Sequence, residues 1–137
     1  MSAYSPFIVL HLHRRRKMLN EPLEYANKVY GRIVVAKGFI TDFASIGALL
    51  YIAPLLYALL AGYGDKAATI HDWLYRGYGI VTATGTYYPT RKEADRIFYA
   101  ALRDEGVARW RASFFYVGVR LFGRSSFVGR QNVFNAI

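Results

Sequence analysis

The feature that most constrains this chain is a long stretch without a single charged side chain. It covers residues 43–64, which is 22 positions in a chain of 137. A helix of that length could span a bilayer, but Pro54 lies near its middle and Gly47 and Gly62 lie near its ends. Because proline interrupts helical hydrogen bonding, we predict one or two short helices in the core or at a protein interface. A membrane-surface helix and a true span are the alternatives.

The residues before this stretch have the composition of β-strands. Residues 6–13, 23–27 and 29–36 are rich in β-branched and aromatic side chains, and residues 39–42 form a further short segment that ends in a loop. The basic run at residues 14–17 is typical of a solvated turn or sheet edge. We therefore predict a small antiparallel sheet in residues 1–42.

The residues after the uncharged stretch carry helix signals. Asp65 is positioned to cap a helix over residues 66–76, and Thr90 with Glu93 forms a capping box that starts a helix over residues 90–104. A last helix over residues 108–122 ends at Gly123. Residues 77–89 contain several glycines, threonines and tyrosines and a proline, so we expect a loop or a small hairpin there.

These patterns predict an α+β fold, with a small antiparallel N-terminal sheet followed by three or four packed helices. We expect one domain over residues 1–137. Within it, residues 1–42 are mainly strands, residues 43–64 are an apolar helical segment, residues 65–123 hold the helices with the candidate site, and residues 124–137 form a tail.

Composition excludes several classes of protein. A hydrophobic fraction of 54% is too high for an intrinsically disordered chain. The absence of cysteine excludes a disulfide scaffold, a thiolate zinc site and a cysteine nucleophile. Near the N-terminus the basic residues follow the apolar stretch instead of preceding it, so we expect no secretory signal peptide.

Acidic residues are scarce, with 9 against 18 Lys and Arg, so their positions are informative. Asp42, Asp72 and Asp95 lie among apolar neighbours instead of in charged runs. Burying a carboxylate without a partner is costly. These three residues are therefore the first candidates for a functional site.

A histidine accompanies two of these acids. His71 and Asp72 lie on one predicted helix with Tyr75 one turn after His71, and Asp95 lies on the next helix. If the two helices pack antiparallel, Asp95 can bind one ring nitrogen of His71 and leave the other to take a proton from water. Asp72 points about 100° away on its helix and is left to bind a cation or a cationic side chain.

This pattern is similar to the active site of the phospholipases A2, which carry His-Asp-x-x-Tyr on one helix and an aspartate on a second, antiparallel helix. The matching residues here are 71–75 (HDWLY) and 94–98 (ADRIF). The resemblance implies that His71 is the general base, Asp95 its orienting partner, Tyr75 a support for Asp95, and Asp72 a calcium ligand. The chain departs from that family in its calcium loop. The glycines at residues 62–64 lie too close to His71 to supply the backbone carbonyl ligands.

A second resemblance covers most of the chain. Residues 38–46 (GFITDFASI), 71–75 (HDWLY) and 93–98 (EADRIF) resemble, in this order, the DUF1353 family. That family consists of small proteins encoded largely by bacteriophages and prophages, and its biochemical role is unsettled. The resemblance implies a phage origin and adds Asp42 and Ser45 to the candidate site. In the first block Gly47 replaces the proline that is usual in that family.

Other interpretations of the same residues remain open. His71, Tyr75, Asp95 and Asp42 could form a purely structural hydrogen-bond network, and Asp42 and Ser45 could cap the helix that follows. His11 and His13 lie on one face of a predicted strand and could bind zinc together with His71. A Ser45–His71–Asp95 triad is a further alternative, but no glycine-rich nucleophile elbow surrounds Ser45.

The excess of lysine and arginine over acidic residues gives a formal net charge of +9. The sequence has no RNP, KH or zinc-finger signature, so we expect no sequence-specific nucleic-acid binding. The charge predicts non-specific attraction to DNA, to anionic lipid or to an acidic protein subunit.

Two hypotheses of function follow. The first is a structural or assembly component of a phage virion, in its tail or connector region. Such a component would be made in the cytoplasm of the bacterial host and would dock on other virion subunits through basic and apolar surfaces. The second is a hydrolase of phospholipase A2-like type that uses His71 and Asp95 on membrane or envelope substrates. A divalent cation, calcium at Asp72 and Asp42 or zinc at the histidines, could serve as a cofactor under this second hypothesis, and the alternative is a His–Asp pair that acts without a metal.

Overall fold

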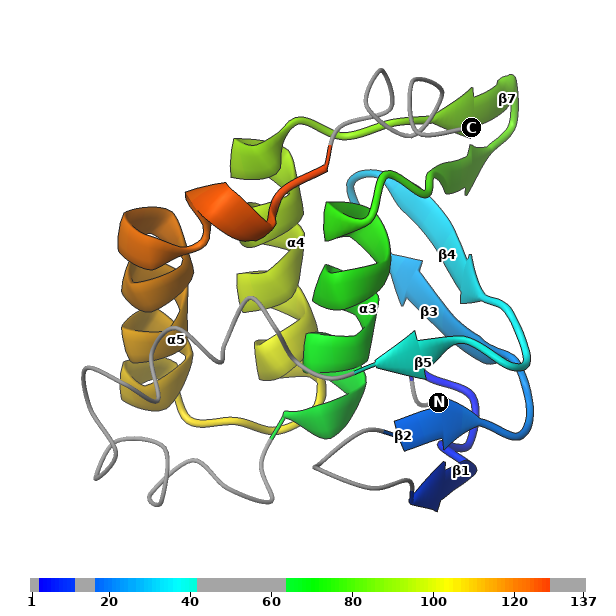
Figure 1. Ribbon diagram of the computed structural model, residues 1–137. Coiled ribbons are helices and arrows are strands. Elements are labelled where there is room, and N and C mark those ends of the chain that lie inside the picture. The colour runs from blue at the N-terminus through cyan, green and yellow to red at the C-terminus, as the bar shows by residue number, and fades with distance from the viewer. Residues whose placement is uncertain (1–2, 12–16, 42–63, 129–137) are drawn as a thin grey trace.

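Figure 1 shows a computed structural model of the chain, which describes residues 3–11, 17–41 and 64–128. These ranges contain two antiparallel sheets and three α-helices, so the predicted α+β class is confirmed. The uncharged segment at residues 43–63 lies outside the described residues, as do Asp42, Ser45 and His13. Within the described ranges, none of the helices is both long enough and apolar enough to cross a bilayer.

The first sheet contains β1 (Val9–His11), β2 (Lys17–Leu19) and β5 (Ile40–Thr41), in the order β1-β2-β5. Val9 pairs with Leu19, and Met18 pairs with Ile40. The predicted strand over residues 6–13 is therefore present in a shorter form. This sheet brings Thr41, at the end of β5, within hydrogen-bond distance of Asp72.

The second sheet corrects the prediction of a single N-terminal sheet. It contains β3 (Leu23–Asn27), β4 (Gly31–Val35), β6 (Ile80–Thr82) and β7 (Gly85–Tyr87), in that order. The hairpin within residues 77–89 thus adds to the edge of β4, where its backbone groups gain partners. Gly31 allows this approach, because a Cβ at that position would lie 2.7 Å from the Val81 carbonyl oxygen.

The three helices are α3 (Asp65–Tyr75), α4 (Arg91–Asp104) and α5 (Arg109–Phe122), and a short 3₁₀ turn (Arg124–Ser126) follows them. Helix α3 lies between the sheets and α4, and α5 packs on the far side of α4 (Figure 1). Helices α3 and α4 run antiparallel (Figure 1). Both helices contribute apolar side chains to one buried core, among them Ile70, Leu74, Ile97 and Phe98.

One predicted helix cap is confirmed and one is wrong. At the start of α4, the Thr90 hydroxyl accepts from the Glu93 N–H and the Glu93 carboxylate accepts from the Thr90 N–H. Helix α3 instead has Gly64 as its N-cap, and no side-chain cap bond comes from that residue. Its first N–H groups, of Lys66 and Ala67, donate to the carboxylate of Glu105. Asp65 pairs with Lys17 at 3.0 Å.

Candidate active site

The antiparallel packing of α3 and α4 brings His71 and Asp95 into direct contact. His71 Nε2 lies 2.8 Å from Asp95 Oδ1, and neither side chain has any exposed surface. His71 lies in the second turn of α3, and Asp95 lies on the buried face of α4 beside Ala94. The approach expected from the helix pattern is therefore present in the structure.

Asp95 is the centre of a larger polar cluster. Its Oδ1 atom also accepts from the Tyr75 hydroxyl at 2.5 Å, and its Oδ2 atom accepts from Arg120 Nη1 at 2.8 Å. Arg91 Nη1 lies 3.7 Å from Oδ2. Buried polar groups need such partners, and this carboxylate has them on both oxygens.

Two members of this cluster, Arg91 and Arg120, are missing from the site that the sequence predicts. Arg91 lies four residues before Asp95 on α4, a spacing at which opposite charges meet. That spacing could have identified Arg91. Arg120 comes from α5, 25 residues after Asp95, and no local pattern points to it. In the sequence it looks like one more basic surface residue.

The environment holds Asp95 in its charged form. Burial alone would raise the pKa of Asp95, but hydrogen bonds from His71, Tyr75 and Arg120 outweigh it and keep the pKa below its usual value. Burial, together with the hydrogen bond to Asp95, raises the pKa of the Tyr75 hydroxyl well above its usual value. Tyr75 is therefore a neutral donor to a carboxylate that remains ionised near neutral pH.

His71 is held in its neutral form. Burial lowers its pKa, although the Asp95 carboxylate acts in the opposite direction. Its ring lies between those of Tyr75 and Phe98, with centroid distances of 4.0 and 4.5 Å. An ionised carboxylate only accepts hydrogen bonds, so the proton of the neutral ring lies on Nε2. The Nδ1 atom is the basic nitrogen.

Asp72, the predicted cation ligand, faces other partners. Its Oδ2 atom accepts from the Thr41 hydroxyl at 2.8 Å and lies 3.3 Å from Arg76 Nη2. Arg76 also donates to the carbonyl oxygen of Ile40, so this contact joins α3 to β5. Asp72 therefore pairs with a cationic side chain, which is one of the two roles that the sequence leaves open.

The described residues do not make up a calcium or zinc site. They contain no group of three or more His, Asp or Glu side chains that could hold a metal, and calcium needs 6–8 oxygen ligands. The other residues proposed as ligands or as a nucleophile, Asp42, Ser45 and His13, lie outside the described residues.

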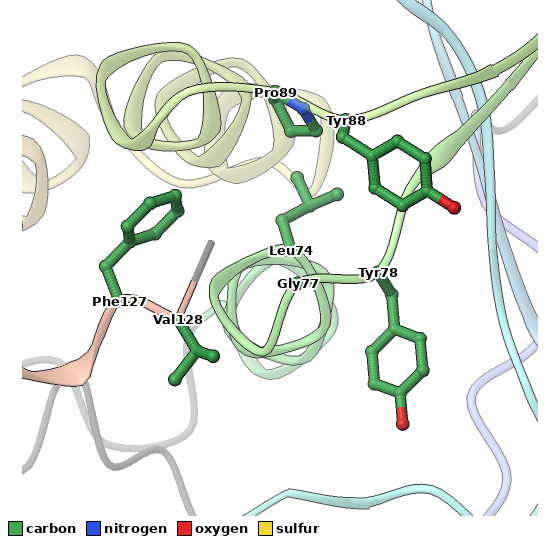
Figure 2. Close-up of a pocket in the computed structure, with 7 residues that line it drawn as sticks. All are labelled: Leu74, Gly77, Tyr78, Tyr88, Pro89, Phe127 and Val128. Atoms are coloured by element: carbon green, nitrogen blue, oxygen red, sulfur yellow. The ribbon is translucent and has the colours of Figure 1, made fainter. Parts of the chain in front are cut away.

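A small hollow lies at the C-terminal end of α3, next to Tyr75. Figure 2 shows its lining, which comes from the end of α3, the segment before α4 and the residues after α5: Leu74, Gly77, Tyr78, Tyr88, Pro89, Phe127 and Val128. Its volume is about 10 Å³, room for about one water molecule. Phe127 packs edge-on against Tyr75, and the Val128 N–H donates to the Tyr75 carbonyl oxygen. The hollow is too small for a substrate.

The fold and the site together define a class of protein: an α+β domain with a buried His–Asp pair between two antiparallel helices. The chain belongs to the DUF1353 family, described as "Protein of unknown function", whose family model matches residues 17–119. The match includes His71, Tyr75, Arg91 and Asp95. No curated protein and no solved structure is significantly similar to the chain.

Proposed function

We propose that the chain is a hydrolase in which His71 is the general base and Asp95 its orienting partner. The observation that carries this proposal is the 2.8 Å contact between His71 Nε2 and Asp95 Oδ1. An imidazole must be unprotonated, and so neutral, before it can act as a general base, and burial favours the neutral form of His71. The aspartate fixes both the tautomer and the orientation of the ring, as in other His–Asp pairs.

The proposed reaction is the hydrolysis of an ester or amide of a membrane or envelope molecule. His71 Nδ1 takes a proton from water while the water oxygen bonds to the carbonyl carbon of the substrate. When the bond to the leaving alcohol or amine breaks, the same proton passes from Nδ1 to that group. Asp95 stays ionised throughout, and the Tyr75 hydrogen bond keeps its carboxylate in place.

The first experiment compares the wild-type protein with His71→Asn. Vesicles of anionic phosphatidylglycerol and of neutral phosphatidylcholine serve as substrates, with a soluble nitrophenyl ester beside them, and fatty-acid or nitrophenol release is measured. We expect the variant to lose about 10²–10⁴-fold of the activity. Glu21→Gln, which changes an exposed acid in the loop between β2 and β3, should keep it.

Two results would overturn the hydrolase proposal. One is full activity in a folded His71→Asn variant. The other is wild-type release that does not exceed that of His71→Asn on any of the three substrates. Because the His71 side chain has no exposed surface, the proposed reaction requires the protein to open locally around this ring. Modification of His71 by diethyl pyrocarbonate needs the same opening and therefore tests for it.

A second candidate function is a structural or assembly component of a virion, and the outer face of α5 favours it. Trp110, Phe114, Val117 and Leu121 lie on that face and are 51–66% exposed. The opposite face of the same helix packs into the core through Ala112, Phe115 and Val119. A contiguous apolar face that is left exposed on a helix marks an interaction site.

For this second candidate, we propose that other virion subunits cover α5 and that the basic surface adds non-specific attraction to DNA or anionic lipid. The excess of 18 basic over 9 acidic residues supports this electrostatic part. A groove of about 250 Å³ lined by Arg96, Tyr99 and Tyr116 offers further aromatic and basic surface on α4 and α5. Assembly of this kind would begin in the cytoplasm of the bacterial host and end in the virion.

The test is incorporation into phage particles. The double variant Phe114→Ser, Leu121→Ser removes much of the apolar outer face and should lower the amount of the protein in purified particles at least about tenfold. Val29→Ser is the matched control, because Val29 is 82% exposed in the turn between β3 and β4, away from α5. Normal incorporation of the folded double variant, or complete absence of the wild-type protein from particles, would refute this candidate.

A further inference from the structure

Asp95 uses its two oxygen atoms for different purposes. Oδ1 faces His71 and Tyr75 from α3, whereas Oδ2 faces Arg120 of α5 at 2.8 Å. The Arg120 side chain is 29% exposed, while that of Asp95 has no exposed surface. A guanidinium thus reaches from the edge of the molecule to a carboxylate in the core.

Arg91 holds this part of α5 in place. Its Nη1 atom donates to the carbonyl oxygen of Val119 at 3.0 Å, and its Nη2 atom donates to that of Arg120 at 3.3 Å. Both carbonyls belong to the last turn of α5, and that of Val119 also accepts from the Gly123 N–H. The first residue of α4 therefore anchors the backbone from which Arg120 extends.

We propose that Arg120, anchored by Arg91, is a positioning residue that supplies the counter-charge of Asp95 and so keeps His71 neutral. This inference rests on the proposed function, in which the neutral imidazole is the base. It assigns a role to a residue of α5, which contributes nothing to the His-Asp-x-x-Tyr pattern. Arg120 itself acts through Asp95 and does not need to touch a substrate.

The physical reason is the balance of charge around the ring. A carboxylate within hydrogen-bond distance of an imidazole favours its protonated form, and a cation on the far side of that carboxylate weakens the effect. The charged and titratable groups near His71 among the described residues are Asp72, Tyr75 and Arg76 of α3, Arg91 and Asp95 of α4, and Arg120 of α5. Arg76 pairs with Asp72, and Arg120 with Arg91 balances Asp95.

The test is a titration of the histidine rings by nuclear magnetic resonance. The chain has only 3 histidines, and His71→Asn assigns the His71 signal. In the wild-type protein the His71 titration midpoint should lie below that of an ordinary histidine, because burial lowers the pKa of the ring. In Arg120→Gln its titration midpoint should rise by about one pH unit or more, while Arg120→Lys should keep the midpoint near that of the wild type.

Arg124→Gln is the matched control, since Arg124 is an exposed arginine just after α5, and it should leave the His71 signal unchanged. If Arg120→Gln does not fold, Arg91→Gln replaces it and should raise the midpoint in the same direction. An unchanged His71 midpoint in the folded variant would overturn the inference, and so would an equal rise in the Arg124→Gln control.

This readout is independent of hydrolysis. A shifted midpoint in a protein that cleaves none of the substrates would support the role of Arg120 and refute the hydrolase. Cleavage by the wild type, together with an unshifted His71 midpoint in Arg120→Gln, would support the hydrolase and refute the role of Arg120. If both the hydrolase proposal and the role of Arg120 hold, the acid limb of the profile of kcat against pH should move to higher pH in Arg120→Gln.

Discussion

Each of the two faces of α5 contains one departure from the usual distribution of polar and apolar side chains. Its inner side delivers the Arg120 guanidinium to a carboxylate that has no exposed surface. Its outer side presents Trp110, Phe114 and Leu121 at half exposure or more. Buried charge and exposed apolar surface are the informative departures in a folded protein. The inner face of α5 is therefore the candidate for a role in chemistry, and its outer face is the candidate for contact with a partner.

Two phenylalanines give the largest expected difference in stability between the buried site and the outer face of α5. Phe98 has no exposed surface and packs on His71, whereas Phe114 is 52% exposed on the outer face of α5. Phe98→Ala should lower the free energy of unfolding by about 3–5 kcal/mol. Phe114→Ala should change it by less than about 0.5 kcal/mol. Denaturant unfolding measures both, and a large loss at Phe114 would mean that this chain itself covers the outer face.

Removing a charge from the cluster around Asp95 should lower the free energy of unfolding by slightly less than Phe98→Ala does. Asp95→Asn keeps the volume of the side chain but removes the charge that pairs with Arg120 and Arg91. We expect a loss of about 3 kcal/mol in the free energy of unfolding, because a broken ion pair leaves guanidinium groups without their partner. Glu21→Gln is the exposed control and should stay within about 0.5 kcal/mol of the wild type. Equal stability of the two variants would contradict a cluster that supports the fold.

Lowering the pH should destabilise the protein through the buried His71 and Asp95, whereas the apolar side chains on the outer face of α5 do not titrate. The pKa of folded His71 is lowered by burial, while in the unfolded chain it is about 6.5. Below pH 6.5 the unfolded chain therefore binds a proton that the folded chain does not, and stability falls as pH decreases. The slope contributed by this group is at most about 1.4 kcal/mol per pH unit. Asp95, whose pKa is also lowered, adds a loss in the same direction below about pH 4.

Unfolding measured between pH 7 and pH 5 tests this dependence. His71→Gln should remove its part of the slope, since glutamine does not titrate. Phe114→Ala should keep the full slope. A wild-type protein with no loss of stability over this range would contradict the lowered pKa of His71.

The smallest predicted effect concerns the start of α4, which carries Arg91 to Asp95. Thr90→Ala removes the side-chain half of the capping box and should cost about 1 kcal/mol. If the cap also fixes Arg91, the His71 titration midpoint should move slightly upward in this variant. Thr84→Ala, in the exposed turn between β6 and β7, is the control and should change neither quantity.

The sequence alone determined the parts of this protein that depend on neighbours along the chain. The helix periodicity of α4 and its Thr90–Glu93 capping box are local signals, and both are present in the structure. The spacing of His71 and Tyr75, with Asp95 on the next helix, predicted which side chains could meet, because residues one turn apart share a helix face.

Tertiary structure decided what no short window of sequence contains. Glu105 caps α3 from 38 residues away, the β6–β7 hairpin extends the sheet at β4, and Arg120 reaches Asp95 from another helix. Each of these contacts satisfies a buried or unpaired polar group whose partner is set by packing. The sequence therefore determined the His–Asp pair as a candidate, and only the packing of α5 decided the charge that surrounds it.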